Sequence, residues 1–180
     1  MKGWSRLALA AVAIAAPAAA VPSHRAAHAR GVADPRAFVV QVYAAYGRGD
    51  STPGPDVDYS YSDRLRRLFH DYETWERAQN GELVGALNFD WWTNSQEWGI
   101  SHVVVTQTDP GPDRRFVIAR FDNEGRHETN RFEFVRIGGR WYLDDVVNGA
   151  GTGDGTSTAP GSTGWTLSAL LRGMGARPVF

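Results

Sequence analysis

Residues 98–147 contain the clearest secondary-structure pattern of the chain and read WGISHVVVTQTDPGPDRRFVIARFDNEGRHETNRFEFVRIGGRWYLDDVV. The β-branched and aromatic residues of this stretch form four runs, which are separated by short segments rich in Pro, Gly, Asn and Asp. The expected strands are Ile100–Thr108, Arg115–Asp122, His127–Ile137 and Arg140–Val147. Because short turns join consecutive strands in antiparallel pairs, the sequence predicts a four-stranded meander.

Two helices are predicted on the N-terminal side of this sheet. The first begins at Pro35 with Asp34 as its N-cap, and the second follows the N-cap Ser62 and ends near Asn80. Helices followed by strands, without βαβ alternation, predict an α+β fold with the N-terminal helices packed on a curved antiparallel sheet of about four strands. The apolar face of the first helix, which we expect to be buried against the last strand, holds Phe38, Val42 and Tyr46.

The N-terminal segment has the three parts of a secretory signal peptide. Residues 1–6 carry two positive charges, residues 7–16 form an apolar run, and residues 17–20 are small. The run is shorter than the about 20 residues that a membrane-spanning helix needs. We therefore predict a signal peptide over residues 1–20, with cleavage after Ala20 or alternatively after Ala29. The mature protein is expected in the periplasm or the medium, without stable membrane insertion.

Composition divides the rest of the chain into four parts. Residues 21–33 lack apolar periodicity and predict a disordered leader, whereas residues 34–148 predict the folded α+β domain. Residues 149–164 are rich in Gly, Ser and Thr, which is typical of a flexible linker. The apolar spacing in residues 165–173 predicts a short C-terminal helix that docks on the domain.

The overall composition argues against several classes of function. The 180 residues include 19 Lys and Arg, 20 Asp and Glu, and no cysteine. The lack of cysteine excludes disulfides and thiolate chemistry, and the near-neutral charge gives no reason to expect nucleic acid as a partner. The three histidines of the predicted folded domain, His70, His102 and His127, show none of the spacings typical of a metal site, and no glycine-rich phosphate-binding motif is present. We expect neither a metal nor another cofactor.

The densest group of binding-type residues lies in residues 88–98, NFDWWTNSQEW. Three indoles stand beside amides and carboxylates, a combination that binding pockets and interfaces use. The segment is either a binding loop or a loop that covers the core with its indoles turned inward. If it is a binding loop, the expected binding residues are Trp91, Trp92, Gln96 and Trp98.

The last strand supplies a further candidate, Asp145. Strand alternation places Asp145 on the same face as Trp141 and Leu143, so its carboxylate is expected inside. A buried carboxylate needs a partner or a raised pKa. Asp145 is therefore either a structural acid paired with an arginine, for which Arg120 is a conceivable partner, or a general base and the one candidate catalytic residue.

The order of several motifs resembles an uncharacterised exported bacterial family known as domain of unknown function 3828. The motifs are Phe38-Val39-x-x-Val42-Tyr43-x-x-Tyr46, Tyr61-Ser62-x-x-Leu65, Asn88-Phe89-Asp90, Asn94-Ser95-Gln96-Glu97-Trp98, Trp141-x-Leu143-Asp144-Asp145-Val146 and Leu167-Ser168-Ala169-Leu170-Leu171. Glu97 stands where that family more often has Asp. The resemblance covers about residues 34–171 and implies a cystatin-like, or nuclear-transport-factor-two-like, cone. It implies no particular activity, because that fold hosts isomerases, dehydratases, transport adaptors and immunity proteins alike.

Three hypotheses for function follow from these features. The leading one is an exported, non-catalytic binding or interaction domain for an unknown small molecule or protein. The second is a small cone-fold hydrolase or isomerase that uses Asp145. The third is an immunity-type protein that binds a toxin through the Trp-rich loop.

Overall fold

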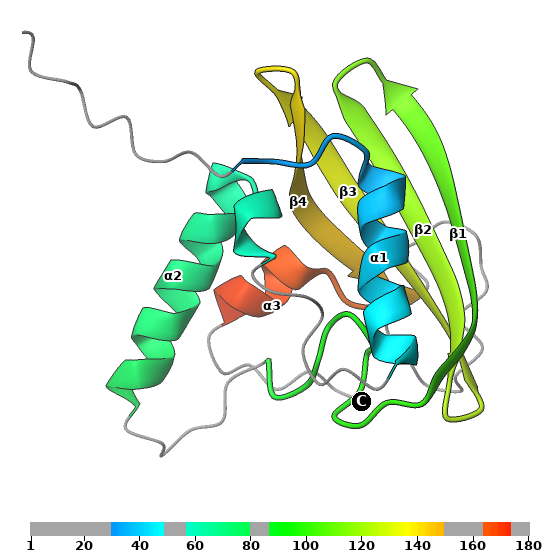
Figure 1. The fold of residues 1–180 in the computed structure, drawn as a ribbon. Coiled ribbons are helices and arrows are strands. Elements are labelled where there is room, and N and C mark those ends of the chain that lie inside the picture. Colours follow the sequence, from blue (N-terminus) through cyan, green and yellow to red (C-terminus); the bar gives the residue numbers. More distant parts are fainter. Residues whose placement is uncertain (1–29, 49–56, 80–86, 150–163, 174–180) are drawn as a thin grey trace, which may run out of the picture.

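An antiparallel meander with strand order β1-β2-β3-β4 forms the sheet (Figure 1). The computed structural model describes residues 30–48, 57–79, 87–149 and 164–173. The strands are β1 (Ile100–Gly111), β2 (Arg114–Asn123), β3 (Arg126–Ile137) and β4 (Arg140–Asn148). All four predicted strands are present and slightly longer than predicted. The predicted α+β class is confirmed.

Side-chain caps start the two longer helices where the sequence predicts them. In α1 (Pro35–Gly47), the Asp34 carboxylate accepts backbone N–H bonds from the first turn at 2.9 and 3.2 Å. In α2 (Asp63–Ala78), the Ser62 hydroxyl accepts the N–H of the third helical residue at 3.1 Å. Each cap satisfies amides that have no partner within the helix. Both predicted N-caps are therefore confirmed.

The aromatic face of α1 lies across the sheet rather than on its last strand. Tyr43 packs 4.9 Å from Phe121 of β2, measured between ring centroids, and Phe38 packs 6.3 Å from Phe134 of β3. In Figure 1, α1 crosses the face of the sheet near β1 and β2, and α2 lies on the β4 side. The expectation that α1 packs against the last strand is wrong, because α2 and the C-terminal helix α3 (Leu167–Gly173) contact β4 instead. The predicted burial is confirmed for Phe38, Val42 and Tyr46.

The outer edge of β4 is covered by chain segments from three parts of the sequence. Backbone hydrogen bonds of 2.8 to 3.0 Å link the pairs Val32–Trp141, Ser62–Leu143 and Trp165–Asn148. These bonds satisfy an edge that would otherwise offer unpaired donors and acceptors to another chain. They also explain why the C-terminal helix begins two residues later than predicted, because Trp165 and Thr166 are extended along β4.

The folded unit begins a few residues before the predicted start at residue 34. Gly31 and Val32, which the sequence assigned to a disordered leader, are buried against β4. Gly31 has φ of 58°, and a β-carbon at this position would lie 2.8 Å from the ring of Tyr142. Only glycine fits this conformation and this close approach without strain.

Several sequence predictions concern segments outside the described residues. These are the signal peptide over residues 1–20, residues 21–29 of the leader, and residues 150–163 of the predicted linker. Within the described ranges, no helix combines the length and apolar character needed to cross a membrane.

Candidate functional site

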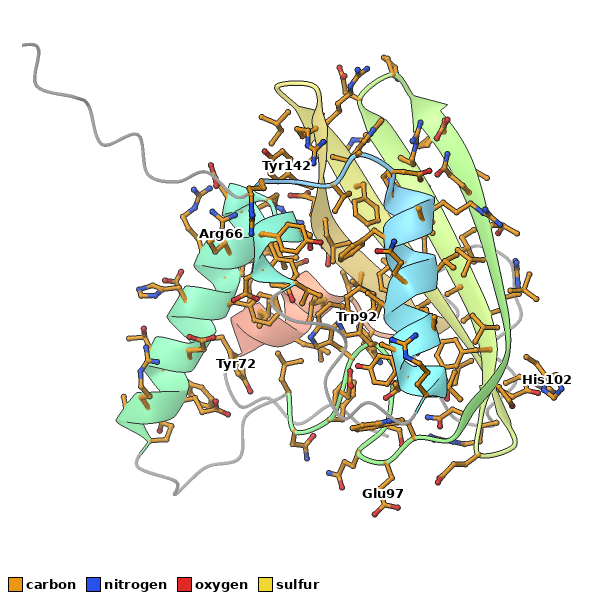
Figure 2. The ribbon with its side chains drawn as sticks, viewed as in Figure 1. Arg66, Tyr72, Trp92, Glu97, His102 and Tyr142 are labelled. Carbon is orange, nitrogen blue, oxygen red and sulfur yellow. The ribbon has the colours of Figure 1, made fainter. Side chains whose placement is uncertain are left out.

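The Trp-rich loop, residues 87–99, contributes two indoles to the core. Trp91 and Trp92 are only 9% and 2% exposed. Trp92 stacks on Trp91 with 4.6 Å between ring centroids and on Phe132 of β3 at 4.8 Å. Figure 2 shows Trp92 in the interior beside α1, while Glu97 points away from the domain. These two indoles therefore cover the core and do not form a binding surface.

The other two candidates of this loop lie nearer to solvent and have separate partners. The Gln96 amide donates to the backbone carbonyl of Asn88 at 3.1 Å, and Gln96 is exposed. Trp98 is half-buried and packs edge-on against Tyr46 at 5.5 Å. Both contacts hold the loop in shape.

Asp145 is buried, as predicted, and its carboxylate is held by three residues. Its Oδ1 accepts the backbone N–H of Val146 at 2.9 Å and that of Ser168 at 3.0 Å. Its Oδ2 accepts the Ser168 hydroxyl at 2.6 Å and Arg64 Nη2 at 3.2 Å. The partner arginine is therefore Arg64 of α2, and the predicted Arg120 lies on the pocket described below. Asp145 fastens α2 and α3 to the sheet.

A β-bulge explains why strand alternation placed Asp145 on the wrong face. Phe134 pairs with Leu143, but Glu133 pairs with Asp145, so β4 has one extra residue at this point. Directly opposed residues share a face. Asp145 therefore lies on the face of Glu133, away from Phe134, and is buried by helices rather than by the aromatic core.

The five predicted site residues do not form one site. Two lie in the core, two shape the loop, and Asp145 joins the helices to β4. Two pockets lined by described residues occur elsewhere, and neither is lined by any of the five.

Buried amides that the sequence did not single out tie the Trp-rich loop to the sheet. Asn130 Nδ2 donates to the Trp92 carbonyl at 2.8 Å, and Asn148 Nδ2 donates to Asn130 Oδ1 at 2.8 Å. Asn94 Nδ2 donates to Glu128 Oε2 at 3.0 Å. Burial raises the pKa of Glu128 above its usual range. Strand alternation alone could have placed Glu128 and Asn130 on one face, but their partners come from distant segments.

A half-buried acid, Asp90, supports the same loop from the other side. Asp90 accepts the Tyr46 hydroxyl at one carboxylate oxygen and the Trp92 backbone N–H at the other, the latter at 2.8 Å. Burial raises the pKa of both Asp90 and Tyr46. The hydrogen bonds oppose this effect on Asp90, because they stabilise its ionised form.

Glu128→Gln is expected to make stability less dependent on pH. A carboxyl with a raised folded-state pKa holds its proton more tightly in the folded than in the unfolded chain, whose Glu pKa is about 4.3. Stability therefore falls as pH rises from about 4 through the folded-state pKa. Urea melts of Glu128→Gln between about pH 4.5 and 7 should show a smaller decrease in the free energy of unfolding with rising pH than the parent shows. Part of the decrease should remain, because the pKa of Asp90 is also raised. The exposed change Glu97→Gln is the matched control, and an equal slope in Glu128→Gln and the parent would contradict the expectation.

A third group of ionisable side chains lies on the sheet face opposite α1. Phe121 points toward α1, so alternation turns Asp122 the other way. His102 Nδ1 of β1 lies 2.8 Å from Asp122 Oδ2, and His127 Nδ1 of β3 is hydrogen-bonded to Oδ1. The sequence pattern did not reveal this group, because its members come from three strands.

The His–Asp–His group borders a pocket of about 270 Å³. Its lining consists of His102, Arg120, Phe121, Asp122, His127, Glu128 and Thr129. The histidine side chains are 81% and 72% exposed, and Figure 2 shows His102 projecting outward from β1. Comparison of the chain with family models, with curated proteins and with solved structures gave no match. The site therefore rests on the geometry of this chain alone.

Proposed function

We propose that this chain is an exported binding domain without catalytic activity, built on a cystatin-like cone. The signal-peptide pattern of residues 1–20 supports export to the periplasm or the medium. The resemblance to the exported family, domain of unknown function 3828, agrees with that compartment and with the cone. The α+β arrangement of helices on a four-stranded sheet is compatible with such a fold.

The observation that carries this proposal is that Trp91 and Trp92 of the Trp-rich loop are packed in the core and that the buried polar side chains are paired. Within the described residues, every buried side-chain nitrogen or oxygen has a hydrogen-bond partner. A general base needs a lone pair aimed at a substrate. Both oxygens of Asp145 are instead engaged by Arg64, Ser168 and Val146. This arrangement favours a structural role for Asp145 over hydrolase or isomerase chemistry.

The burial of the indoles also weighs against toxin binding through the Trp-rich loop. Energetically important interface tryptophans are accessible before the partner binds. Trp91 and Trp92 are instead packed against each other and against Phe132. A partner could reach them only if the loop left the core.

We place the binding surface at the pocket bordered by the His–Asp–His group. This pocket lies on the face of β1, β2 and β3 opposite α1, which we call the β1–β3 face. Its lining combines Arg120 with the hydrogen-bonded His–Asp–His group. A small number of polar groups that converge on a concave surface is typical of small-ligand sites. The other pocket, of about 280 Å³, lies between the N-terminus of α1 and Arg140 and contains no comparable cluster of titratable groups.

A fragment titration of the secreted, mature protein tests this proposal. Intact mass should first show an N-terminus at Val21 or alternatively at Arg30, and a full-length mass in the secreted fraction would contradict the cleaved signal peptide. Neutral, cationic and anionic fragments are then titrated into the ¹⁵N-labelled protein. Bound fragments are expected to shift amide signals of β1–β3 around Asp122. Hits confined to the Trp-rich loop, or turnover that Asp145→Asn abolishes, would overturn the proposal.

A further inference from the structure

His102 is held by the backbone in a position that aims its ring at the pocket. Its φ is 50°, in the left-handed region that strains a residue with a β-carbon. The β1–β2 register shifts between Ser101 and Val104, so β1 bulges at this point. Ser101 is the ladder partner of Asp122, and His102, the next residue in the bulge, reaches the same carboxylate. Bulges and strained residues re-aim side chains near functional sites.

Asp122 determines which nitrogen of each imidazole carries a proton. Hydrogen bonds from His127 and His102 lower the pKa of Asp122, so its carboxylate is ionised and can only accept. Both Nδ1 atoms must then be donors, and in a neutral ring Nε2 has no proton. Protonation of either imidazole therefore adds an N–H at Nε2, the nitrogen that Asp122 does not hold.

Protonation of the two rings gives the pocket a positive charge that favours anion binding, because most of the other charges nearby occur as pairs of opposite sign. Arg120 and Asp122 are of opposite charge on β2, and Arg126 and Glu124 are of opposite charge near the β2–β3 turn. The carboxylate of Glu128 is bonded to Asn94 and Asn148 of the loop and β4. Two protonated imidazoles would thus add two positive charges to a pocket that Arg120 already lines.

We propose that His102, His127 and Arg120 bind a small oxyanion, such as a sulfate, phosphate or carboxylate group, while the imidazoles are protonated and release it as they lose their protons. This inference rests on the proposed function and names the ligand class of its pocket. A metal ion is the less favoured ligand, since the described residues contain no group of three or more His, Asp or Glu arranged to hold one.

Sulfate is the probe of choice, because it stays a dianion across the range in which imidazole titrates. The mature protein is titrated with sulfate at about pH 5.5 and about pH 8, at constant ionic strength, while the imidazole C–H signals are followed by NMR. The expected Kd is about tenfold lower at the acidic pH, with shifts at His102 and His127. Phosphate and acetate at about pH 5.5 then distinguish a phosphate-type from a carboxylate-type ligand.

Three variants and one control separate the site from a general charge effect. His102→Gln and His127→Gln should each weaken sulfate binding at low pH and reduce its pH dependence. His70→Gln, at an exposed histidine of α2, should change neither. In Asp122→Asn the amide nitrogen donates to one ring and shifts that ring's proton to Nε2. Asp122→Asn should therefore bind sulfate at about pH 8 more tightly than the parent protein does.

Two results would overturn the inference. One is a sulfate affinity that is equal at both pH values, and the other is an affinity that neither histidine variant changes. If sulfate does not bind while neutral or cationic fragments bind at the same pocket, the inferred oxyanion ligand is wrong and the proposed function stands. If no fragment binds the β1–β3 face, both are wrong.

Discussion

Trp92→Ala is expected to lower the free energy of unfolding by about 3–5 kcal/mol, the largest effect of any single change considered for this protein. The Trp92 side chain is 2% exposed and stacks on Trp91 and Phe132. It also meets Phe38 of α1 edge-on, with 6.2 Å between ring centroids. Truncation removes this apolar contact and leaves a cavity between the helix and the sheet.

Chemical denaturation of Trp92→Ala, followed by far-ultraviolet circular dichroism, measures this loss. Gln96→Ala, an exposed change in the same loop, is the matched control and should stay within about 0.5 kcal/mol of the parent. A loss below about 1 kcal/mol for Trp92→Ala would mean that the loop does not cover the core. The indole would then have to be reconsidered as a binding residue.

Asp145→Asn is expected to destabilise the fold by about 2–3 kcal/mol, the second-largest effect. The carboxylate accepts four hydrogen bonds, and one of them comes from the partly exposed Arg64. An asparagine side chain has only one acceptor oxygen, so its amide group would face donors from Ser168 or Arg64. Part of the penalty is relieved because the Arg64 side chain is 36% exposed and also bonds to Asp144.

A double-mutant cycle with Arg64→Gln isolates the ion-pair contribution to this loss. Asp109→Asn is the control, because Asp109 pairs with Arg115 at the surface and is 52% exposed, so its effect should be below about 1 kcal/mol. Ligand binding at the β1–β3 pocket should survive Asp145→Asn in the remaining folded protein. Unchanged stability together with lost binding would restore Asp145 as a site residue.

Local patterns were enough to predict the α-helices and the four strands of the described domain, although not the short 3-10 helix Asp58–Ser60. Asp34 and Ser62 cap helices because their side chains satisfy amides only two or three residues away. The turn at Gly138 and Gly139 joins β3 and β4 because both glycines adopt positive φ, at 57° and 81°. The spacing that predicted the strands is likewise a property of neighbouring residues.

The candidate site was predicted less well, because its residues depend on contacts between distant segments. The indoles of residues 88–98 fitted either a binding loop or a cover for the core, and the packing of Trp92 on Phe132 and Phe38 shows the second. No spacing in the sequence links Arg64 to Asp145, which are 81 residues apart. Their pairing follows from the position of α2 beside β4.

The fold class, the helix caps, the strands and the pairing of consecutive strands could be predicted from the sequence, since each depends on residues close together in the chain. The face of Asp145 and the convergence of His102 and His127 on Asp122 emerge only in the folded chain. Both depend on β-bulges, where one extra residue reverses the faces of the side chains beyond it. A period-two pattern in the sequence does not specify where such a residue is inserted, because the insertion is stabilised by contacts with neighbouring strands and helices.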